Sequence, residues 1–431
     1  MRPPFLFLVY TAAASVLVPF FAWVETRKLR AAGFPVVRAH EKLGHATASR
    51  EGSGPLVWFH AASVGESMSV LALITSMGNI VPRAQFLITS GTATSARMVE
   101  KHLPPRTIHQ FAPLDAAGPV GRFLRHWRPN AAVFVESELW PQMLRRTRDT
   151  DARIVLVNAR LSTSSRAAWQ KRPKTARYVL DVFDLILTQN DEMAQAMVDM
   201  HAPADRVARG INLKSLADPL PTDPGVLAPV RVALKGRPVW VAASTHRGEE
   251  DIILRVHKAL LRDWPDLLLI LAPRHPDRRT EVSRAIAAQQ LSYCTRSQNE
   301  LPQEDSVYLA DTLGELGNWY ALSKVIFLGG SLKPVGGHNP FEVALAGAGV
   351  ISGPEVFNFA ETYNEMVTNK AAQFVEDETS LKVAVETLLN SPEAVEDAGR
   401  AARGFVRNKS AQLDAIARRL VNALKLEETN R

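Results

Sequence analysis

Residues 329–342 read Gly329-Gly330-Ser331-Leu332-Lys333-Pro334-Val335-Gly336-Gly337-His338-Asn339-Pro340-Phe341-Glu342. They follow an apolar run that ends at Leu328 and precede a helix-like run. Two glycine pairs allow the backbone to turn sharply and to approach a ligand closely. The following helix start offers unpaired N–H groups to a phosphate, and Glu342 is suited to accept hydrogen bonds from sugar hydroxyls. This order of strand, glycine loop and helix predicts an α/β fold with a nucleotide-sugar site.

The rest of the chain repeats the alternation of strand and helix in two halves. In the first half, apolar runs predict strands at Leu56–His60, Gln85–Thr89, Ile108–Phe111, Ala131–Val135, Ile154–Asn158 and Leu185–Thr188. In the second half they predict strands at Val239–Ala243, Leu267–Ala272, Val307–Ala310, Val325–Leu328 and Val350–Ser352. Such alternation is typical of doubly wound parallel sheets, whose active residues follow the carboxyl ends of the strands.

Length and composition indicate how these halves are organised. A chain of 431 residues is longer than a domain with a single hydrophobic core usually is, so two domains are expected. Four prolines between residues 211 and 230 indicate a linker. We therefore predict an anchor at 1–24, a first domain at 25–210, a linker at 211–230 and a second domain at 231–431. The single cysteine, Cys294, excludes an internal disulfide and is expected to be a core thiol.

The positive charge is concentrated in one region. Between Arg122 and Arg177 the chain has 13 Lys or Arg against 4 Asp or Glu, a local excess of 9 in a chain of net charge +7. A basic region predicts an anionic partner, which from charge alone is nucleic acid, a phosphorylated lipid or an anionic membrane face. A solvated helix face is the structural alternative.

The N-terminus favours a membrane. Pro3 to Val24 is 22 residues without charge, about 33 Å as a helix. Basic residues follow this run, and only Arg2 precedes it, which places the body of the protein in the cytoplasm. A cleaved signal peptide is the alternative, but its positive charge belongs before the apolar run.

Two carboxylates of the first half follow predicted strands. Glu66 lies in His60-Ala61-Ala62-Ser63-Val64-Gly65-Glu66 at a helix start, where it is either a general base toward a hydroxyl or a helix-terminal charge. Glu136 and Glu138 lie in Glu136-Ser137-Glu138-Leu139-Trp140-Pro141. Glu136 comes directly after the apolar run Val133-Phe134-Val135, so we expect it, rather than Glu138, to face the ligand. A buried ion pair with an arginine is its alternative role.

Cations and a second helix start complete the candidate set. Lys214 lies where the first half meets the linker. A cation at this position either offsets the charge on a leaving phosphate or is simply solvated. Arg274 and His275 form a cationic corner between two prolines. Thr312-Leu313-Gly314-Glu315 is a capping box pattern that opens another helix beside the predicted pocket.

Several function classes lose support from missing motifs. The sequence has no G-x-G-x-x-G and no P-loop, which disfavours dinucleotide oxidoreductases and NTPases. The eleven histidines show no zinc spacing. Asp149-Thr150-Asp151 precedes a strand among arginines, so it is better interpreted as a surface turn than as a metal site.

The motifs together resemble a known family. They are HAASVGE (60–66), ESELWP (136–141), NLK (212–214), PRHPDR (273–278), DTLGEL (311–316) and GGSLKPVGGHNPFE (329–342). In combination they resemble the bacterial 3-deoxy-D-manno-octulosonic acid (Kdo) transferases of lipopolysaccharide biosynthesis. The resemblance runs from the N-terminal apolar segment to the last helices.

The resemblance implies a GT-B fold, in which two Rossmann-like doubly wound domains face a cleft, with an N-terminal membrane anchor helix. It implies an inverting glycosyltransferase that moves Kdo from CMP-Kdo to a glucosamine hydroxyl of a lipid A precursor, lipid IVA. The reaction would occur at the cytoplasmic face of the inner membrane, with an anionic membrane surface rather than nucleic acid as partner, and with neither cofactor nor metal.

The resemblance also implies roles for individual residues. Glu66 matches the general base, and Glu136 and Lys214 match transition-state stabilisers. The positions matching the CMP-binding residues are Arg274, His275, Gly314, Glu315, Leu316, Asn339, Pro340, Phe341 and Glu342. Ser215 and Leu216 depart from the family pattern, which affects the expected pose of that loop.

Three other functions remain to be weighed against this interpretation. A non-hydrolysing sugar-nucleotide epimerase would need neither the apolar N-terminus nor the basic region. A lipid-linked transferase that uses a UDP-sugar differs only in its donor. A membrane-tethered nucleotide-sugar binding protein would show no transfer at all.

Overall fold

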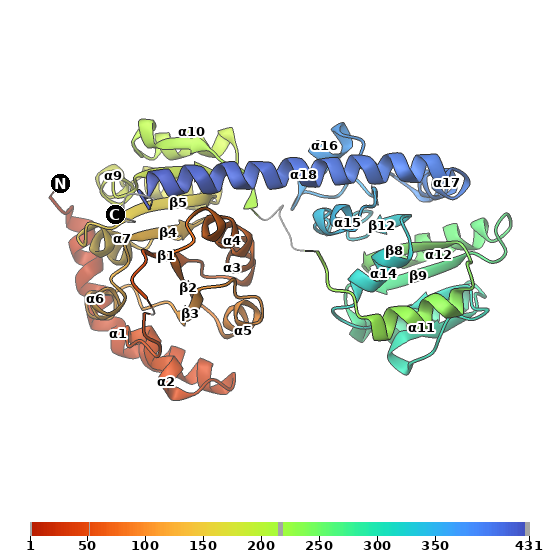
Figure 1. The fold of residues 1–431 in the computed structure, drawn as a ribbon, viewed down its shortest axis with the longest axis horizontal. Helices are drawn as coiled ribbons and strands as arrows, with labels where there is room; N and C mark the ends of the chain where they lie inside the picture. Colours follow the sequence, from red (N-terminus) through yellow and green to blue (C-terminus); the bar gives the residue numbers. More distant parts are fainter. Residues whose placement is uncertain (1, 51, 214–218, 427–431) are drawn as a thin grey trace. The chain divides into compact units, whose positions relative to one another are not determined.

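The computed structural model describes residues 2–50, 52–213 and 219–426. This part of the chain divides into two compact units, and Figure 1 shows the elements of each. The first unit contains residues up to 213 together with 411–426, and the second contains 219–410. Each unit is built on one seven-stranded sheet in which all paired strands are parallel.

The first sheet has the strand order β3-β2-β1-β4-β5-β6-β7. Its strands are β1 (Leu56–His60), β2 (Gln85–Ser90), β3 (Thr107–Phe111), β4 (Ala131–Val135), β5 (Arg153–Ala159), β6 (Leu185–Thr188) and β7 (Val207–Arg209). The central strands β1 and β4 are fully buried, and β5 is buried except at its first residue, Arg153, as expected of strands covered on both faces. The order reverses between β1 and β4, which is where doubly wound sheets bind ligands.

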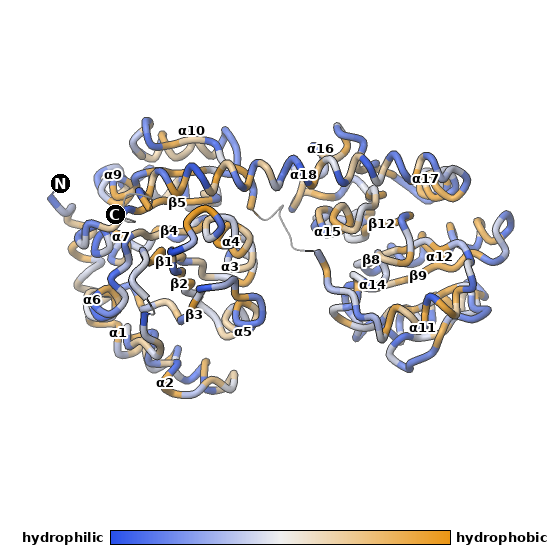
Figure 2. Tube along the Cα trace, viewed as in Figure 1, coloured by the Kyte–Doolittle hydropathy of each residue, from blue (hydrophilic) through white to orange (hydrophobic). Residues whose placement is uncertain are grey.

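Helices cover both faces of the first sheet. They are α3 (Val64–Ser69), α4 (Leu71–Ile80), α5 (Ala93–Lys101), α6 (Ala117–Trp127), α7 (Pro141–Arg148), α8 (Thr163–Gln170), α9 (Pro173–Leu180) and α10 (Asp191–Asp199). One apolar cluster joins the sheet to α3 and α4, and a second joins its other face to α6, α7, α9 and α10. The strands of both units are largely hydrophobic in the coloured trace of Figure 2.

The second sheet has the order β10-β11-β9-β8-β12-β13-β14. Its strands are β8 (Val239–Thr245), β9 (Leu268–Pro273), β10 (Tyr293–Thr295), β11 (Val307–Leu309), β12 (Ile326–Leu328), β13 (Val350–Ser352) and β14 (Ala372–Phe374). Its helices are α11 (Pro224–Leu234), α12 (Glu250–Leu260), α13 (Arg279–Ala288), α14 (Leu316–Leu322), α15 (Phe341–Leu345), α16 (Ala360–Thr368) and α17 (Glu378–Asn390). The order reverses between β8 and β12, so the glycine stretch follows a strand at the switch point.

All eleven predicted strands are present, with boundaries that shift by at most two residues. The short strands β7 and β14 were not predicted, whereas β10 lies in the strand-like run Leu291–Thr295 that contains Cys294. β7 and β14 close one edge of their sheets and have only partly buried or exposed side chains, so they lack the apolar signal of a core strand.

The units differ from the predicted domains at two points. Leu213 is buried in the core of the first unit and α11 begins at Pro224, so much of the predicted linker at 211–230 is ordered structure. Helix α18 (Pro392–Ala423) starts in the second unit, but its residues from 411 belong to the first. The reason is that Leu413, Ala417 and Leu420 form one helical stripe that is buried in the first unit's core.

The N-terminal helix α1 (Phe5–Ala31) continues past the predicted anchor end at residue 24 and belongs to the first unit. Within the described residues it is the one helix long and apolar enough to cross a membrane. After it come α2 (Val36–Ala39) and the short 3-10 helix η1 (His40–Leu43). Their Glu41 and Lys42 are almost fully buried.

Candidate active site

Glu66 lies in the first turn of α3, directly beyond the carboxyl end of β1. Its Oε2 accepts hydrogen bonds from the N–H groups of Ala62 (2.9 Å) and Ser63 (3.4 Å). In return, Ser63 Oγ accepts the N–H of Glu66 at 3.2 Å, which completes a capping box. The structural alternative proposed for Glu66 is therefore present in the molecule.

The capping interaction occupies one of the two carboxylate oxygens of Glu66 and leaves the other available for chemistry. Glu66 is 9% exposed, and among the described residues only its Oε2 accepts hydrogen bonds. One oxygen is thus fixed by the backbone while Oε1 can take a proton from a hydroxyl. Capping and base catalysis are compatible because they use different oxygens of one side chain.

A buried lysine supports the turn that contains Glu66. Lys42 Nζ donates to Gly91 O at 2.7 Å, and Gly91 N donates to Ala62 O at 2.9 Å. Burial lowers the pKa of Lys42 to about 8, an effect that nearby Glu25 and Glu41 oppose. The chain from Lys42 to Ala62 fixes the backbone whose N–H orients Glu66.

Glu136 follows β4, on the other side of the sheet's switch point from Glu66. It is 6% exposed and adopts a left-handed backbone with φ 53°. Its Oε1 accepts a hydrogen bond from Asn158 Nδ2 at 3.1 Å. Glu138 has a different partner, since its Oε2 lies 3.1 Å from His60 Nε2.

The Glu138 carboxylate is bonded to neighbouring side chains of the first unit. It is 7% exposed, and its Oε2 also accepts the indole N–H of Trp140. Burial would raise its pKa, but the hydrogen bond and charge of His60, with the indole N–H, outweigh burial and hold the pKa below the usual range. Glu138 is therefore an ionised carboxylate bound to its own neighbours.

Lys214 lies outside the described residues. The described chain before it ends at Leu213, which is buried and whose N–H donates to Asn158 Oδ1 at 3.1 Å.

In the second unit, the predicted CMP-binding residues follow neighbouring strands. Arg274 and His275 follow β9, residues 314–316 follow β11, and residues 339–342 follow β12. In the sheet, β11, β9, β8 and β12 are consecutive, so their carboxyl ends form one edge. The fold thus brings together segments that lie up to 68 residues apart in the sequence.

The glycine stretch is held by a carboxylate that the sequence interpretation missed. Glu249 is fully buried and its two oxygens accept four backbone N–H groups. Oε2 accepts those of His246 (2.8 Å) and Gly330 (2.7 Å), and Oε1 accepts those of Ser331 and Leu332 (both 2.9 Å). Gly330 and Gly336 have φ values of 68° and 107°, so the predicted need for glycine is met.

The edge is rich in basic side chains. The rings of His246 and His338 are stacked with 2.9 Å between their Nε2 atoms, and His246 packs edge-on against His275. Burial, and then the charge of nearby His246 and Arg274, lowers the pKa of His338 to about 4. Burial raises the pKa of Glu342, and the charge of Arg274 opposes that shift. An anion bound here would meet Arg274 and polarisable imidazoles.

Two details of the predicted helix starts differ from expectation. The Phe341 N–H is taken by Asn339 Oδ1 at 3.1 Å, so it is not free for a phosphate. Helix α14 begins at Leu316 with no side-chain cap, and the Thr312 hydroxyl donates to the Glu315 carboxylate rather than accepting a backbone N–H. Glu315 also forms a two-pronged ion pair with Arg296, which fixes this loop from the neighbouring segment.

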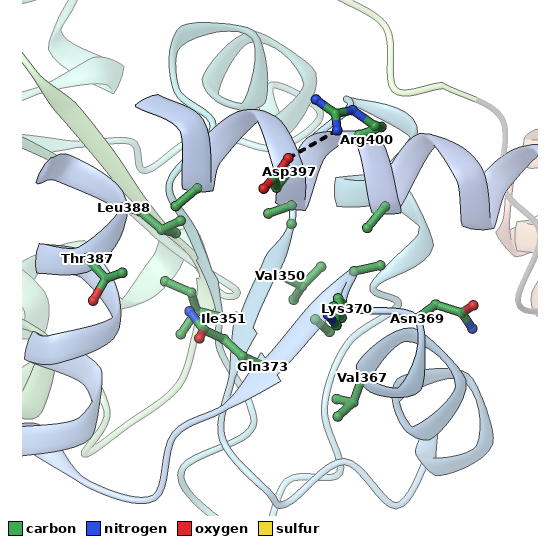
Figure 3. Close-up of a pocket in the computed structure, with 16 residues that line it drawn as sticks. Val350, Ile351, Val367, Asn369, Lys370, Gln373, Thr387, Leu388, Asp397 and Arg400 are labelled. Atoms are coloured by element: carbon green, nitrogen blue, oxygen red, sulfur yellow. Dashed lines mark ion pairs between the residues drawn. The ribbon is translucent and has the colours of Figure 1, made fainter. Parts of the chain in front are cut away.

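A large cavity of about 760 Å³ lies elsewhere in the second unit. Figure 3 shows it beside Val350, Ile351 and Gln373, with the Asp397–Arg400 ion pair on α18 above it. It opens at the amino ends of β13 and β14, the edge opposite to the predicted site residues, and none of them lines it. Across the described ranges, no group of three or more His, Cys, Asp or Glu could hold a metal ion.

Two parallel Rossmann-like sheets with polar residues beyond their switch points define a GT-B glycosyltransferase fold. A solved glycosyltransferase from Rickettsia africae shares this fold, with a TM-score of 0.55 and 14% identity, over 87% of this chain and 99% of that chain. The family described as "3-Deoxy-D-manno-octulosonic-acid transferase (kdotransferase)" matches residues 37–217.

Full-length relatives extend that match. A probable 3-deoxy-D-manno-octulosonic acid transferase, mitochondrial, of Arabidopsis thaliana is 33% identical over 89% of this chain and 88% of its own length. The 3-deoxy-D-manno-octulosonic acid transferase of Bordetella pertussis is 31% identical over 97% of this chain and 98% of its own length. The chain belongs to the Kdo transferase family and is a glycosyltransferase.

Proposed function

We propose that this enzyme transfers Kdo from CMP-Kdo to a glucosamine hydroxyl of a lipid A precursor, with inversion at the anomeric carbon. The observation that carries the proposal is the geometry of Glu66, a nearly buried carboxylate beyond the switch-point strand with one oxygen fixed and the other available. A carboxylate in that state is prepared to act as a general base.

In the proposed reaction, Glu66 Oε1 takes the proton of the acceptor hydroxyl. The hydroxyl oxygen forms a bond to the anomeric carbon of Kdo from the face opposite to CMP. The bond between that carbon and the phosphate oxygen breaks, and CMP leaves with the electron pair. Glu136 and Lys214 stabilise the charge that develops in the transition state, and one displacement gives inversion.

We assign donor binding to the second unit. Arg274, His275 and the segments 314–316 and 339–342 are proposed to hold CMP, because they lie on one edge and present cations to a phosphate. Acceptor binding is assigned to the first unit, where the basic region between Arg122 and Arg177 and helix α1 both lie. A phosphorylated lipid provides both the negative charge and the apolar chains that this unit would recognise.

We further propose that α1 lies in the membrane plane at the cytoplasmic face of the inner membrane. Contacts with the first unit occur near both ends of the helix, at Phe7, which packs on Tyr178, and at Leu29, which is buried. Phe7 and Leu29 are about 33 Å apart along the helix. If α1 crossed the bilayer perpendicular to the membrane plane, it would lose one of these two sets of contacts with the first unit. The outward side exposes Val16, Phe20 and other large apolar residues.

The test is mass spectrometry of the product formed from CMP-Kdo and a tetra-acylated, bisphosphorylated acceptor, with UDP-sugars as alternative donors. Glu66→Gln keeps an oxygen for the Ala62 N–H but cannot act as a base, so we expect transfer to fall by about 10²–10⁴-fold at near-normal stability. Glu192→Gln, an exposed carboxylate in the first turn of α10, is the matched control and should retain activity.

Unchanged transfer by Glu66→Gln would refute the base assignment. Absence of any transfer by the wild-type enzyme with this donor and acceptor would refute the proposed substrates, and transfer from a UDP-sugar would replace the donor.

A further inference from the structure

Two adjacent strands of the first sheet end in residues with unusual backbones. Glu136 after β4 has φ 53°, and Asn158 near the end of β5 has φ 55°. The pairing of β5 with β6 shifts register between Leu156 and Ala159, so Asn158 lies in a bulge. Left-handed residues and bulges carry a conformational cost and concentrate at functional sites, where they direct a side chain.

The side chains of these two residues are joined. Asn158 is 1% exposed, and its Nδ2 donates to Glu136 Oε1 at 3.1 Å while its Oδ1 accepts the Leu213 N–H at 3.1 Å. The second bond fixes the amide orientation, because a flipped amide would direct Nδ2 at the Leu213 N–H and Oδ1 at a carboxylate. A side chain with both a donor and an acceptor is required at this position.

We propose that Asn158 is a positioning residue of the transferase: it holds the Glu136 carboxylate in its reactive orientation and is itself locked by the Leu213 amide. The inference rests on the proposed function, in which Glu136 stabilises the transition state. Asn158 acts through Glu136 and is not assigned any contact with the substrate.

Three variants separate this role from a merely structural one. Asn158→Gly keeps the left-handed backbone but removes both side-chain hydrogen bonds. Asn158→Asp keeps the acceptor for Leu213 but places a carboxylate against Glu136. The double variant Glu136→Gln/Asn158→Asp exchanges amide and carboxylate, so the hydrogen bond reforms with the charge at the wrong position. Asn299→Asp, at an exposed left-handed asparagine, is the matched control.

The measurements are kcat and KM for CMP-Kdo, CMP affinity by calorimetry, and the melting temperature of each full-length variant. Asn158→Gly and Asn158→Asp should each lower kcat by about 100-fold, since a misplaced catalytic group costs that much. KM for CMP-Kdo and CMP affinity should stay within about twofold, because the donor is assigned to the other unit. The double variant should recover the melting temperature lost in Asn158→Asp while kcat remains low.

Other outcomes overturn the inference. Full activity of Asn158→Gly would show that the position needs only its backbone conformation. Wild-type kcat in Asn158→Asp, or no thermal recovery in the double variant, would show that the two side chains are not coupled. If the wild-type enzyme transfers no Kdo, the proposed function fails and takes this inference with it; an active wild type with unaffected Asn158 variants refutes the inference alone.

Discussion

Replacing Glu249 by Gln tests what holds the glycine stretch in shape. The Glu249 carboxylate is fully buried and accepts four backbone N–H groups, three of them from residues 330–332. Glutamine has nearly the same shape, but only one of its two terminal atoms accepts hydrogen bonds. The amide NH₂ would therefore face two backbone donors, either those of His246 and Gly330 or those of Ser331 and Leu332.

The expected cost follows from this count. Each backbone N–H that stays buried without an acceptor costs about 1–3 kcal/mol, so two cost about 2–6 kcal/mol. For a unit of this size, 1 kcal/mol corresponds to about 2–4 °C in melting temperature, so we expect a fall of about 4–24 °C. The lower end applies if the loop relaxes enough for water to reach the two donors.

Hydrogen exchange read by mass spectrometry gives the local assay, and thermal melting gives the global one. In Glu249→Gln the amides of residues 330–332 should exchange faster than in the wild type, and CMP should bind more weakly. Asp251→Asn is the matched control, because it makes the same chemical change at an exposed position in the first turn of the same helix, α12. Unaltered exchange at residues 330–332 together with an unaltered melting temperature would refute the structural role of Glu249.

Two further predictions concern pH and the membrane. Burial lowers the pKa of His257 to about 4. Between pH 6.5 and 4 the imidazole is therefore protonated in the unfolded chain but not in the folded protein. The stability that the neutral His257 contributes is complete above pH 6.5 and is lost as the pH falls. Lowering the pH from 7 to 5 should cost about 2 kcal/mol through this group; urea unfolding at both pH values should show a smaller loss in His257→Gln, and an equal loss would contradict the assignment. Replacing the exposed Phe20 and Trp23 by Ser should reduce flotation with anionic liposomes by about tenfold or more at unchanged melting temperature; unchanged flotation would show that this side of α1 does not enter the membrane.

The apolar runs predicted the core strands because a strand that is buried on both faces consists almost entirely of apolar residues. Strands such as Ala131–Val135 need apolar side chains at every position, and the structure has this strand with the same bounds. Edge strands such as Ala372–Phe374 leave no such mark, since their side chains are partly or fully exposed. The same reasoning explains why the sequence left open against which half the end of α18 packs: its apolar stripe shows that it is buried but not against which sheet.

Within the candidate site, motif and strand-end position indicated which residues to consider. Glu66, Glu136 and Arg274 each follow a strand, and that much is readable from local sequence. The supporting residues were harder to identify. Asn158 lay at the end of a predicted strand, and only its left-handed backbone and its two partners distinguish it.

The sequence by itself determined the two α/β halves, the glycine-bracketed stretch at 329–342 and the apolar N-terminal helix, because each depends on local composition and on the order of elements. The tertiary structure alone decided that Glu249 gathers the backbone of that stretch, that Asn158 links Glu136 to Leu213, and that α1 packs along the first unit. These contacts join residues that are far apart in the chain. They depend on strand order and on hydrogen-bond geometry, which no local pattern encodes.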